Sequence, residues 1–395
     1  MKLIRRPSCR HGLVLVGVLA LVACGGGDAG PPVAVEAPPP AEGGVRAIEV
    51  EEAWRWPAPP PGSVGMPEAD GDGVAATYGH LRLVLLDLDG GVRWEVERRG
   101  LRDVAPALTA DLVVAATEKG VVAVERSTGK VRWDTEVGER ANSPVVAGDL
   151  VVVSTWEASL TAFHLADGRV AWRAPLPGPA IGPAATDGEA VVVTWESKFG
   201  DAAGAVAVDG ADGRQRWSVP LDPGGVGAPA IVALRDVGDS EVGGGTEVGD
   251  SVVVLVAGDL AAHGLGLADG AERWRTGTDG RGSPEVPPLP LGGGEVLVAH
   301  RLAGLDLLDA ATGEVQWGGS AGGAAVRGGP DGPGPDGPFA FPTDDGRLLL
   351  VGPGWEPTAK DWPGRISGVT MAPNGLFLVA TREARENHLI ALTVS

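Results

Sequence analysis

The chain has 395 residues, of which 32 are basic and 52 are acidic, giving a formal net charge of −20 at pH 7. A protein this acidic repels nucleic acid and anionic lipid, which excludes the classes that bind these polyanions by charge. Its two cysteines are Cys9 and Cys24, so the rest of the chain has no thiol for a disulfide, a nucleophile or a zinc site.

The first 23 residues have the composition of an export signal. A basic head formed by Lys2, Arg5, Arg6 and Arg10 precedes an apolar run over Leu13–Val22. Such a run is too short for a bilayer-spanning helix, which needs roughly 20 residues, and is typical of a cleaved secretory signal. Loss of the basic head leaves 28 basic residues against 52 acidic ones, a net charge of −24.

The signal ends on Leu21-Val22-Ala23-Cys24, which resembles the lipobox of bacterial lipoproteins. In that family a peptidase cuts before the cysteine, whose thiol carries a diacylglycerol. The resemblance implies a lipid on Cys24 and an exported protein, anchored to the outer face of the cytoplasmic membrane or to the outer membrane where there is one. The alternative is an ordinary cleaved signal that contains a cysteine.

Gly, Pro and Ala dominate residues 24–50. This composition buries too little apolar surface to fold, so we expect a flexible tether. The sequence therefore divides into a signal peptide at 1–23, the tether at 24–50 and one folded domain at 51–395. A domain of this size can fold on its hydrophobic core alone.

The folded part repeats one short pattern, a turn of Asp-Gly or Thr-Gly with a tryptophan four residues after the glycine. The tryptophans of these copies are Trp94, Trp133, Trp172, Trp217, Trp274 and Trp317, spaced 39, 39, 45, 57 and 43 residues apart. A period near forty residues, with valine-rich segments between turns, is typical of a β-propeller built from four-stranded blades.

The clearest copy predicts an inner strand at Pro144–Val146, apolar strands at Leu150–Thr155 and Ser159–Leu165, and an outer strand at Val170–Arg173. Strands this apolar are buried on both faces, as expected where blades stack. One tryptophan per repeat at one position indicates a wedge between neighbouring blades. The arginine that precedes it in four copies is expected on the opposite strand face, paired with acidic neighbours.

The weaker copies bring the prediction to eight blades, with seven as the alternative. Residues 52–56, which include Trp56, look like an outer strand with no strands before it. Phe377–Ala380 and Leu389–Val394 look like inner strands with no tryptophan after them. We therefore expect the N-terminal strand to close the ring against the C-terminal strands.

The region after Gly318 decides between the two blade counts. Trp362 ends an eighth copy if Pro338–Pro342 and Arg347–Val351 are strands of a full blade. The Gly- and acid-rich stretches 236–250 and 318–337 are expected to be loop insertions.

The repeat resembles a known family. An inner-strand proline, a double-valine strand and a Thr-Gly-Lys-Val-Arg-Trp ending resemble the PQQ-like propeller repeat, which occurs in quinoprotein dehydrogenases and in BamB-like outer-membrane assembly lipoproteins. The resemblance covers residues 51–395 and is strongest in the second and third repeats. It implies an all-β propeller of eight four-stranded blades.

The residues do not support the chemistry of the quinone enzymes in that family. Those enzymes bind the quinone beside two adjacent, bonded cysteines, which this chain lacks. The histidines after the signal form no metal-spaced pair, and the segments 70–73 and 87–90 lack the full ligand spacing of calcium loops. We expect hairpin turns there, and no catalytic residue, cofactor or metal.

These observations favour a monomeric, non-enzymatic, lipid-anchored extracytoplasmic propeller that acts as a protein-binding scaffold or adaptor at the cell envelope. Binding is expected in the rim loops or the central funnel. The alternatives are a BamB-like outer-membrane protein assembly factor, a surface protein that binds a small molecule or sugar, and a PQQ-dependent dehydrogenase. The expected partners are the membrane, through Cys24, and a protein, with no nucleic acid.

Overall fold

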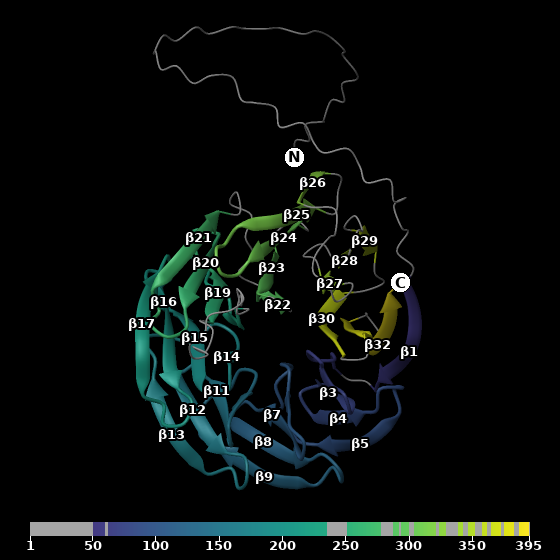
Figure 1. Cartoon of the computed structure of the whole chain (residues 1–395). Helices are drawn as coiled ribbons and strands as arrows, with labels where there is room; N and C mark the ends of the chain where they lie inside the picture. Colours follow the sequence, from purple (N-terminus) through teal and green to yellow (C-terminus); the bar gives the residue numbers. More distant parts are fainter. Residues whose placement is uncertain are drawn as a thin grey trace, which may run out of the picture. The chain divides into compact units, whose positions relative to one another are not determined.

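Eight antiparallel β-sheets stand around a ring in the computed structural model (Figure 1). The structure describes residues 50–59, 62–234, 251–277, 287–291, 294–299, 304–320, 324–328, 339–342, 347–351, 358–361, 365–372, 375–382 and 387–394. Within these ranges every regular element is a strand, and none is a helix long and apolar enough to cross a membrane. The all-β propeller predicted from the repeats is confirmed.

The first five blades follow the chain from the innermost strand to the outermost. Blade 1 contains β2 (Glu68–Asp70), β3 (Gly73–Tyr78), β4 (Arg82–Leu86) and β5 (Val92–Glu97), and blade 2 contains β6 (Ala107–Leu108), β7 (Leu112–Ala116), β8 (Gly120–Glu125) and β9 (Val131–Glu136). Blade 3 contains β10 (Val145–Ala147), β11 (Leu150–Ser154), β12 (Ser159–His164) and β13 (Val170–Pro175), and blade 4 contains β14 (Ala185–Thr186), β15 (Ala190–Glu196), β16 (Ala203–Asp209) and β17 (Gln215–Leu221). Blade 5 contains β18 (Ala230–Val232), β19 (Val252–Val256), β20 (Ala261–Gly266) and β21 (Glu272–Gly277).

Blades 6 and 7 depart from four strands. Blade 6 has five, β22 (Leu289–Leu291), β23 (Glu295–Ala299), β24 (Gly304–Asp309), β25 (Val315–Ser320) and β26 (Ala324–Gly328). In the described residues blade 7 has three, β27 (Phe339–Pro342), β28 (Arg347–Val351) and β29 (Thr358–Asp361). Trp362 and the stretch 236–250 lie outside the described residues.

The expected loop insertion over 318–337 is wrong in its first part. Strand β25 continues to Ser320, and β26 pairs along its outer edge, with Trp317 opposite Gly328 and Ser320 opposite Ala324. The sequence here is rich in Gly and Ala, but a strand ladder is held by backbone hydrogen bonds and tolerates small side chains at an edge. The remainder of the stretch is outside the described residues.

The last blade joins the two ends of the chain. It contains β30 (Arg365–Met371), β31 (Phe377–Arg382) and β32 (Asn387–Val394), and β1 (Val50–Ala58) is its outermost strand. Strand β1 runs antiparallel to β32, with Val50 opposite Val394 and Ala58 opposite Asn387. The predicted closure of the ring by the N-terminal strand is confirmed.

The outer strands share one irregularity of register. The ladder skips the residue directly before each repeat tryptophan, so Trp94 lies opposite Leu85 and Trp133 opposite Ala123. A bulge of this kind inserts one unpaired residue and kinks the strand. The skipped residue is often an arginine, and the expected ion pairs form, for example Arg93 with Asp72 at 2.9 Å.

Each repeat tryptophan with a described side chain contacts the next blade in the same way. Its indole Nε1–H donates to a main-chain oxygen in the turn before the next outer strand, over 2.7–3.0 Å. These tryptophans are Trp54, Trp94, Trp133, Trp172, Trp217 and Trp274. The ring of each one also packs against the glycine of that turn. The repeated turn and the repeated tryptophan are therefore two halves of one contact between blades.

In β1 this contact belongs to Trp54 and not to Trp56, the residue expected from the sequence. A bulge between Glu52 and Trp54 places Trp54 in the register of the other repeat tryptophans. The Trp56 ring is buried two residues further on and meets the Tyr78 ring edge to face, with centroids 5.2 Å apart. The side chain of Trp317 is not among those that the structure describes.

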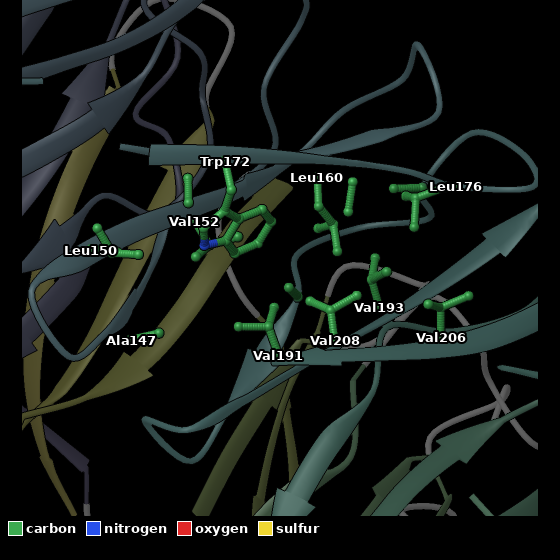
Figure 2. Packing of buried hydrophobic residues seen from close by; sticks show 14 residues of the cluster. Ala147, Leu150, Val152, Leu160, Trp172, Leu176, Val191, Val193, Val206 and Val208 are labelled. Carbon is green, nitrogen blue, oxygen red and sulfur yellow. The ribbon is translucent and has the colours of Figure 1, made fainter. Parts of the chain in front are cut away.

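Apolar side chains fill the space between blades. Between blades 3 and 4, Figure 2 shows Val152 and Trp172 facing Val191 and Val208 of the neighbouring blade. Comparable buried clusters join the other described neighbours, including Ala76 of blade 1 with Leu389 of blade 8. At about 25 cal/mol per Å² of apolar area, such burial supplies most of the stabilisation of a fold without disulfides.

Substitution of a turn glycine by alanine tests the interblade contact. Gly168 has φ of +71°, and a Cβ there would lie 2.5 Å from Cδ2 of Trp133, whereas Gly148 has φ of +60° and open space around it. We expect Gly148→Ala to lower the free energy of unfolding by about 1 kcal/mol, from backbone strain alone. Gly168→Ala should lower it by about 3 kcal/mol, because the tryptophan must also move.

Urea unfolding followed by tryptophan fluorescence measures both variants. Equal losses in the two would show that only the positive φ matters and that the glycine–tryptophan contact does not hold the blades together.

Candidate interaction surface

The two faces of the ring differ in charge. Successive hairpins of a blade alternate between the two ends of its sheet. The loops that join the first strand to the second, and those that join the third strand to the outer one, therefore lie on the same face of the ring. We call this face the acidic face. Its loops in the described part of the chain carry Asp72, Asp87, Asp89, Asp111, Asp149, Asp167, Asp187, Glu189, Asp212, Asp269 and Glu314, against Arg126, Lys130, Arg169 and Arg214. The described loops of the opposite face carry acidic and basic residues in similar number, so an ordinary protein can approach them without strong repulsion.

This opposite face presents two aromatic side chains on neighbouring blades. Trp156 lies in the loop between β11 and β12 of blade 3 and is 52% exposed, and Phe199 lies in the corresponding loop of blade 4 and is 92% exposed. The connection between the two blades, residues 176–184, contains three prolines and no charged residue. We call Arg140, Trp156, residues 176–184 and Phe199 the blade 3–4 surface.

Trp156 is held in one orientation. Its Nε1–H donates to Oδ1 of Asn142 over 3.1 Å, and Asn142 is only 5% exposed. The Asn142 amide donates in turn to Ser154 Oγ at 3.0 Å and to the main-chain oxygen of Gly182 at 2.9 Å. An exposed tryptophan fixed by a buried and fully bonded asparagine loses little conformational entropy when a partner covers it.

Arg140 places a positive charge beside the Trp156 ring. Its guanidinium carbon lies 5.7 Å from the ring centroid, within the range of a cation–π contact. Its Nε–H donates to Glu118 over 3.0 Å, and Arg102 approaches the other oxygen of Glu118 at 3.4 Å. Burial acts to raise the pKa of Glu118, but the two arginines outweigh it and hold the pKa below its usual value.

The loop that bears Phe199 is closed by its own hydrogen bonds. The Ser197 amide donates to the Ala202 oxygen over 2.7 Å, and the Ser197 hydroxyl donates to Asp201 over 2.5 Å. Lys198, beside Phe199, has no ion-pair partner among the described residues. Phe199 therefore offers apolar area at the surface of this loop.

Sequence reasoning assigned Trp156 only to a turn and did not single out Phe199. The signal was present for Trp156, because it stands in a predicted hairpin turn, where Gly, Asn, Asp and Ser are normally found. No turn was predicted around Phe199. Their adjacency could not be read from the sequence, since it depends on how blades 3 and 4 sit side by side.

No catalytic constellation forms in the described residues. They hold no group of three or more His, Cys, Asp or Glu side chains arranged for a metal ion. Ser63 donates to Asp103 at 3.0 Å and His80 lies 3.3 Å from the same carboxylate, which puts the carboxylate between hydroxyl and imidazole. A serine nucleophile needs the imidazole in that middle position. His300 lies outside the described residues.

The segments 70–73 and 87–90, which resemble calcium loops in composition, are hairpin turns, as expected. Asp87 accepts the amides of Asp89 and Gly91 at 3.0 and 2.7 Å. Asp70 caps its own turn and binds Arg126, which lies in the β8–β9 turn of blade 2 and is 6% exposed. The hydrogen bond from Arg126 holds the pKa of Asp70 below its usual value.

Glu68 is a carboxyl whose pKa is raised. It lies partly buried on β2, the innermost strand of blade 1. Burial, helped by the negative charge of Asp70, raises its pKa to about 7.

The geometry defines a class first: an all-β propeller of antiparallel blades, in the part of the chain that the structure describes. The chain belongs to the family described as outer membrane protein assembly factor BamB, whose model matches residues 41–145, 82–242, 138–274 and 203–353. The overlapping matches reflect the repeat, since the model aligns in several blade registers. No curated protein sequence matches the chain.

Solved structures show the same fold at low sequence identity. BamB from Moraxella catarrhalis superposes with a TM-score of 0.62 at 13% identity, covering 87% of this chain and 100% of that one. The computationally designed Ika8 protein gives 0.60 at 11% identity, covering 83% and 96%. The quinohemoprotein alcohol dehydrogenase ADHIIG from Pseudomonas putida HK5 gives 0.63 at 11% identity, covering 87% and 76%.

Replacement of Glu68 by glutamine tests the cost of its burial. The folded-state pKa lies above the ordinary value of 4.5, so folding is favoured below pH 4.5 and loses stability as the pH rises through about 7. We expect Glu68→Gln to raise the free energy of unfolding by about 1–2 kcal/mol at pH 8 and to leave it unchanged at pH 4.

Denaturant unfolding at the two pH values measures this difference. The exposed Glu314, changed to glutamine, serves as the control and should show no gain at either pH. A Glu68→Gln variant that is less stable at pH 8 would mean that the carboxylate is stabilised where it lies.

Proposed function

We propose that this protein is a non-enzymatic, lipid-anchored propeller of the cell envelope that binds another protein through the blade 3–4 surface. The observation that carries the proposal is the pre-organised Trp156 beside Arg140, on the same face as the exposed Phe199 of the neighbouring blade. Tryptophan and arginine dominate the energetic centres of protein interfaces, and rigid aromatic side chains bind at low entropic cost.

The position at which β1 begins is consistent with a blade 3–4 surface that faces away from the proposed lipid anchor. Strand β1 begins at Val50 opposite Val394, at the end of the sheet where the other blades have their turns between third and outer strands. The segment that carries the proposed lipid on Cys24 therefore enters the propeller at the acidic face. The blade 3–4 surface lies on the opposite face, where a lipid anchor leaves room for a partner.

A BamB-like role in the assembly of outer-membrane proteins is the second candidate, favoured by the family match over most of the chain. It requires an organism with an outer membrane and specifies which partner the surface binds. The quinohemoprotein neighbour supports the fold alone at 11% identity, and this chain has no cysteine after Cys24 for the bonded pair of such enzymes.

Partner binding is tested by in-cell photocrosslinking from a photoreactive amino acid that replaces Lys198. In a background with Trp156→Ala and Phe199→Ala, we expect the yield of the crosslinked species to fall at least about tenfold, because two aromatic anchors are lost. Val92→Ala with Val170→Ala is the matched control, since both valines are exposed on outer strands away from the surface.

An unchanged yield in the aromatic double variant, with unfolding temperatures equal to that of the natural chain, would refute the surface. Identification of the crosslinked species by mass spectrometry separates the candidates. Components of the barrel-assembly machinery indicate the BamB-like role, and other envelope proteins indicate an adaptor.

The anchor has its own test. Cys24→Ala should move the protein from the membrane fraction to the soluble extracytoplasmic fraction, because a chain without the acyl groups has only an acidic surface to offer the membrane. Cys9→Ala is the control and should leave the distribution unchanged, since Cys9 lies within the signal. Continued membrane association of Cys24→Ala under high salt would contradict lipid attachment there.

A further inference from the structure

Three exposed cations lie in neighbouring loops on the face that bears the blade 3–4 surface. Arg99 is in the connection between blades 1 and 2, Lys119 is in the loop between β7 and β8, and Arg140 is in the connection between blades 2 and 3. The Arg140 guanidinium lies beside the ring of Trp156. We call Arg99, Lys119 and Arg140 the cation patch.

Main-chain hydrogen bonds hold the three loops of the cation patch side by side. The Glu118 amide donates to the Gly100 oxygen over 2.8 Å, which joins the β7–β8 loop to the connection before it. The Gly138 amide donates to the Lys119 oxygen over 3.0 Å, which joins the same loop to the connection after it. The cation patch is therefore one surface, and it continues into the blade 3–4 surface.

The positive charges of the patch are only partly used within the described part of the chain. The Arg99 guanidinium and the Lys119 ammonium form no ion pair and no hydrogen bond with any other described residue. Arg140 donates from Nε to Glu118, whereas its two Nη groups donate to no described residue. A guanidinium with free Nη groups can bind both oxygens of a carboxylate.

The carboxylates of the same loops already have hydrogen-bond donors. Glu118 lies between two arginines, Glu139 accepts the hydroxyl of Thr155 over 3.0 Å, and Glu157 accepts the main-chain amide of Arg140 over 3.0 Å. The acidic groups are thus held by the loops, while the cations project without a counter-ion of their own. Charge complementarity therefore favours an anionic ligand at this patch.

The acidic face lies too far away to cancel this preference at physiological salt. The strands β7 and β8 of blade 2 have five and six residues, and strands of this length span roughly 17–20 Å. Charges in 0.15 M salt are screened over about 8 Å. A ligand at the cation patch therefore responds to the local charge more than to the net charge of −20 of the whole chain.

We infer that the binding surface extends over the cation patch and takes a short acidic segment of the partner protein, with carboxylates at the patch and an apolar side chain on Trp156. This inference rests on the proposed function and names the chemistry of its partner. A nucleic acid or an anionic membrane extends beyond the patch and meets the acidic remainder of the chain. The aspartates on the acidic face of a second copy already bind amides of their own turns, as Asp167 and Asp212 do.

Charge reversal tests the acidic partner, with the photoreactive amino acid in place of Lys198 as the reporter. Arg99→Glu with Lys119→Glu should lower the crosslinking yield in cells at least about tenfold, because two attractions become repulsions. Arg99→Gln with Lys119→Gln should give an intermediate yield, and this neutral pair covers the case in which the reversal is unstable.

The control for charge is Lys130→Glu with Arg214→Glu, which makes the same change of charge on the acidic face. It should leave the yield unchanged. Mass spectrometry of the crosslinked peptide should identify a segment of another protein that is rich in aspartate and glutamate.

An unchanged yield in either cation variant, at the unfolding temperature of the natural chain, would overturn the acidic partner. So would a crosslink to a segment without acidic residues, to a second copy, to nucleic acid or to lipid. If Trp156→Ala with Phe199→Ala abolishes the crosslink and charge reversal does not, the proposed function stands and this inference fails. If no crosslink forms in the natural background, the proposed function fails and this inference fails with it.

Discussion

The ring depends on one contact that is repeated between neighbouring blades, the packing of a tryptophan against the glycine of the next turn. The indole N–H donates to a turn oxygen, and the glycine offers both a positive φ and the space that a Cβ would fill. The bulge before each tryptophan aims its side chain across the interface. Because the contact uses one short segment per blade, the rest of each blade needs only apolar strands of suitable length.

Because this contact uses only one short segment per blade, the loops outside that segment are free to differ between blades. The turns that carry the glycine are constrained by the contact and cluster on the acidic face. There, aspartate carboxylates accept hydrogen bonds from backbone amides of the same turns. The loops on the other face take no part in the contact between tryptophan and turn glycine. There the chain can hold Trp156 in place through the buried Asn142 and expose Phe199 on a short closed hairpin. A structural constraint on one face thus leaves the loops of the other face free to carry the proposed partner binding.

The ionisable groups of the interior fall into two kinds. Asp70 and Arg126 neutralise one another between blades, as a buried charge must. Glu68 has no such partner among the described residues, and burial raises its pKa, whereas His263 lies between the carboxylates of Asp259 and Glu272 of its own blade.

The amino-acid sequence by itself determined the propeller, the position of its turns and the closure of the ring by the N-terminal strand, because repeat period and strand pattern are local and recur along the chain. It suggested Trp56 for the first strand, where a bulge gives the interblade contact to Trp54. It also suggested a loop where β26 adds a fifth strand. Only the tertiary structure decided which residues share a face: Trp156 with Phe199, and His263 with Asp259, Glu272 and Arg275. Such neighbourhoods arise from blade stacking and strand register, which bring together side chains that no local pattern relates.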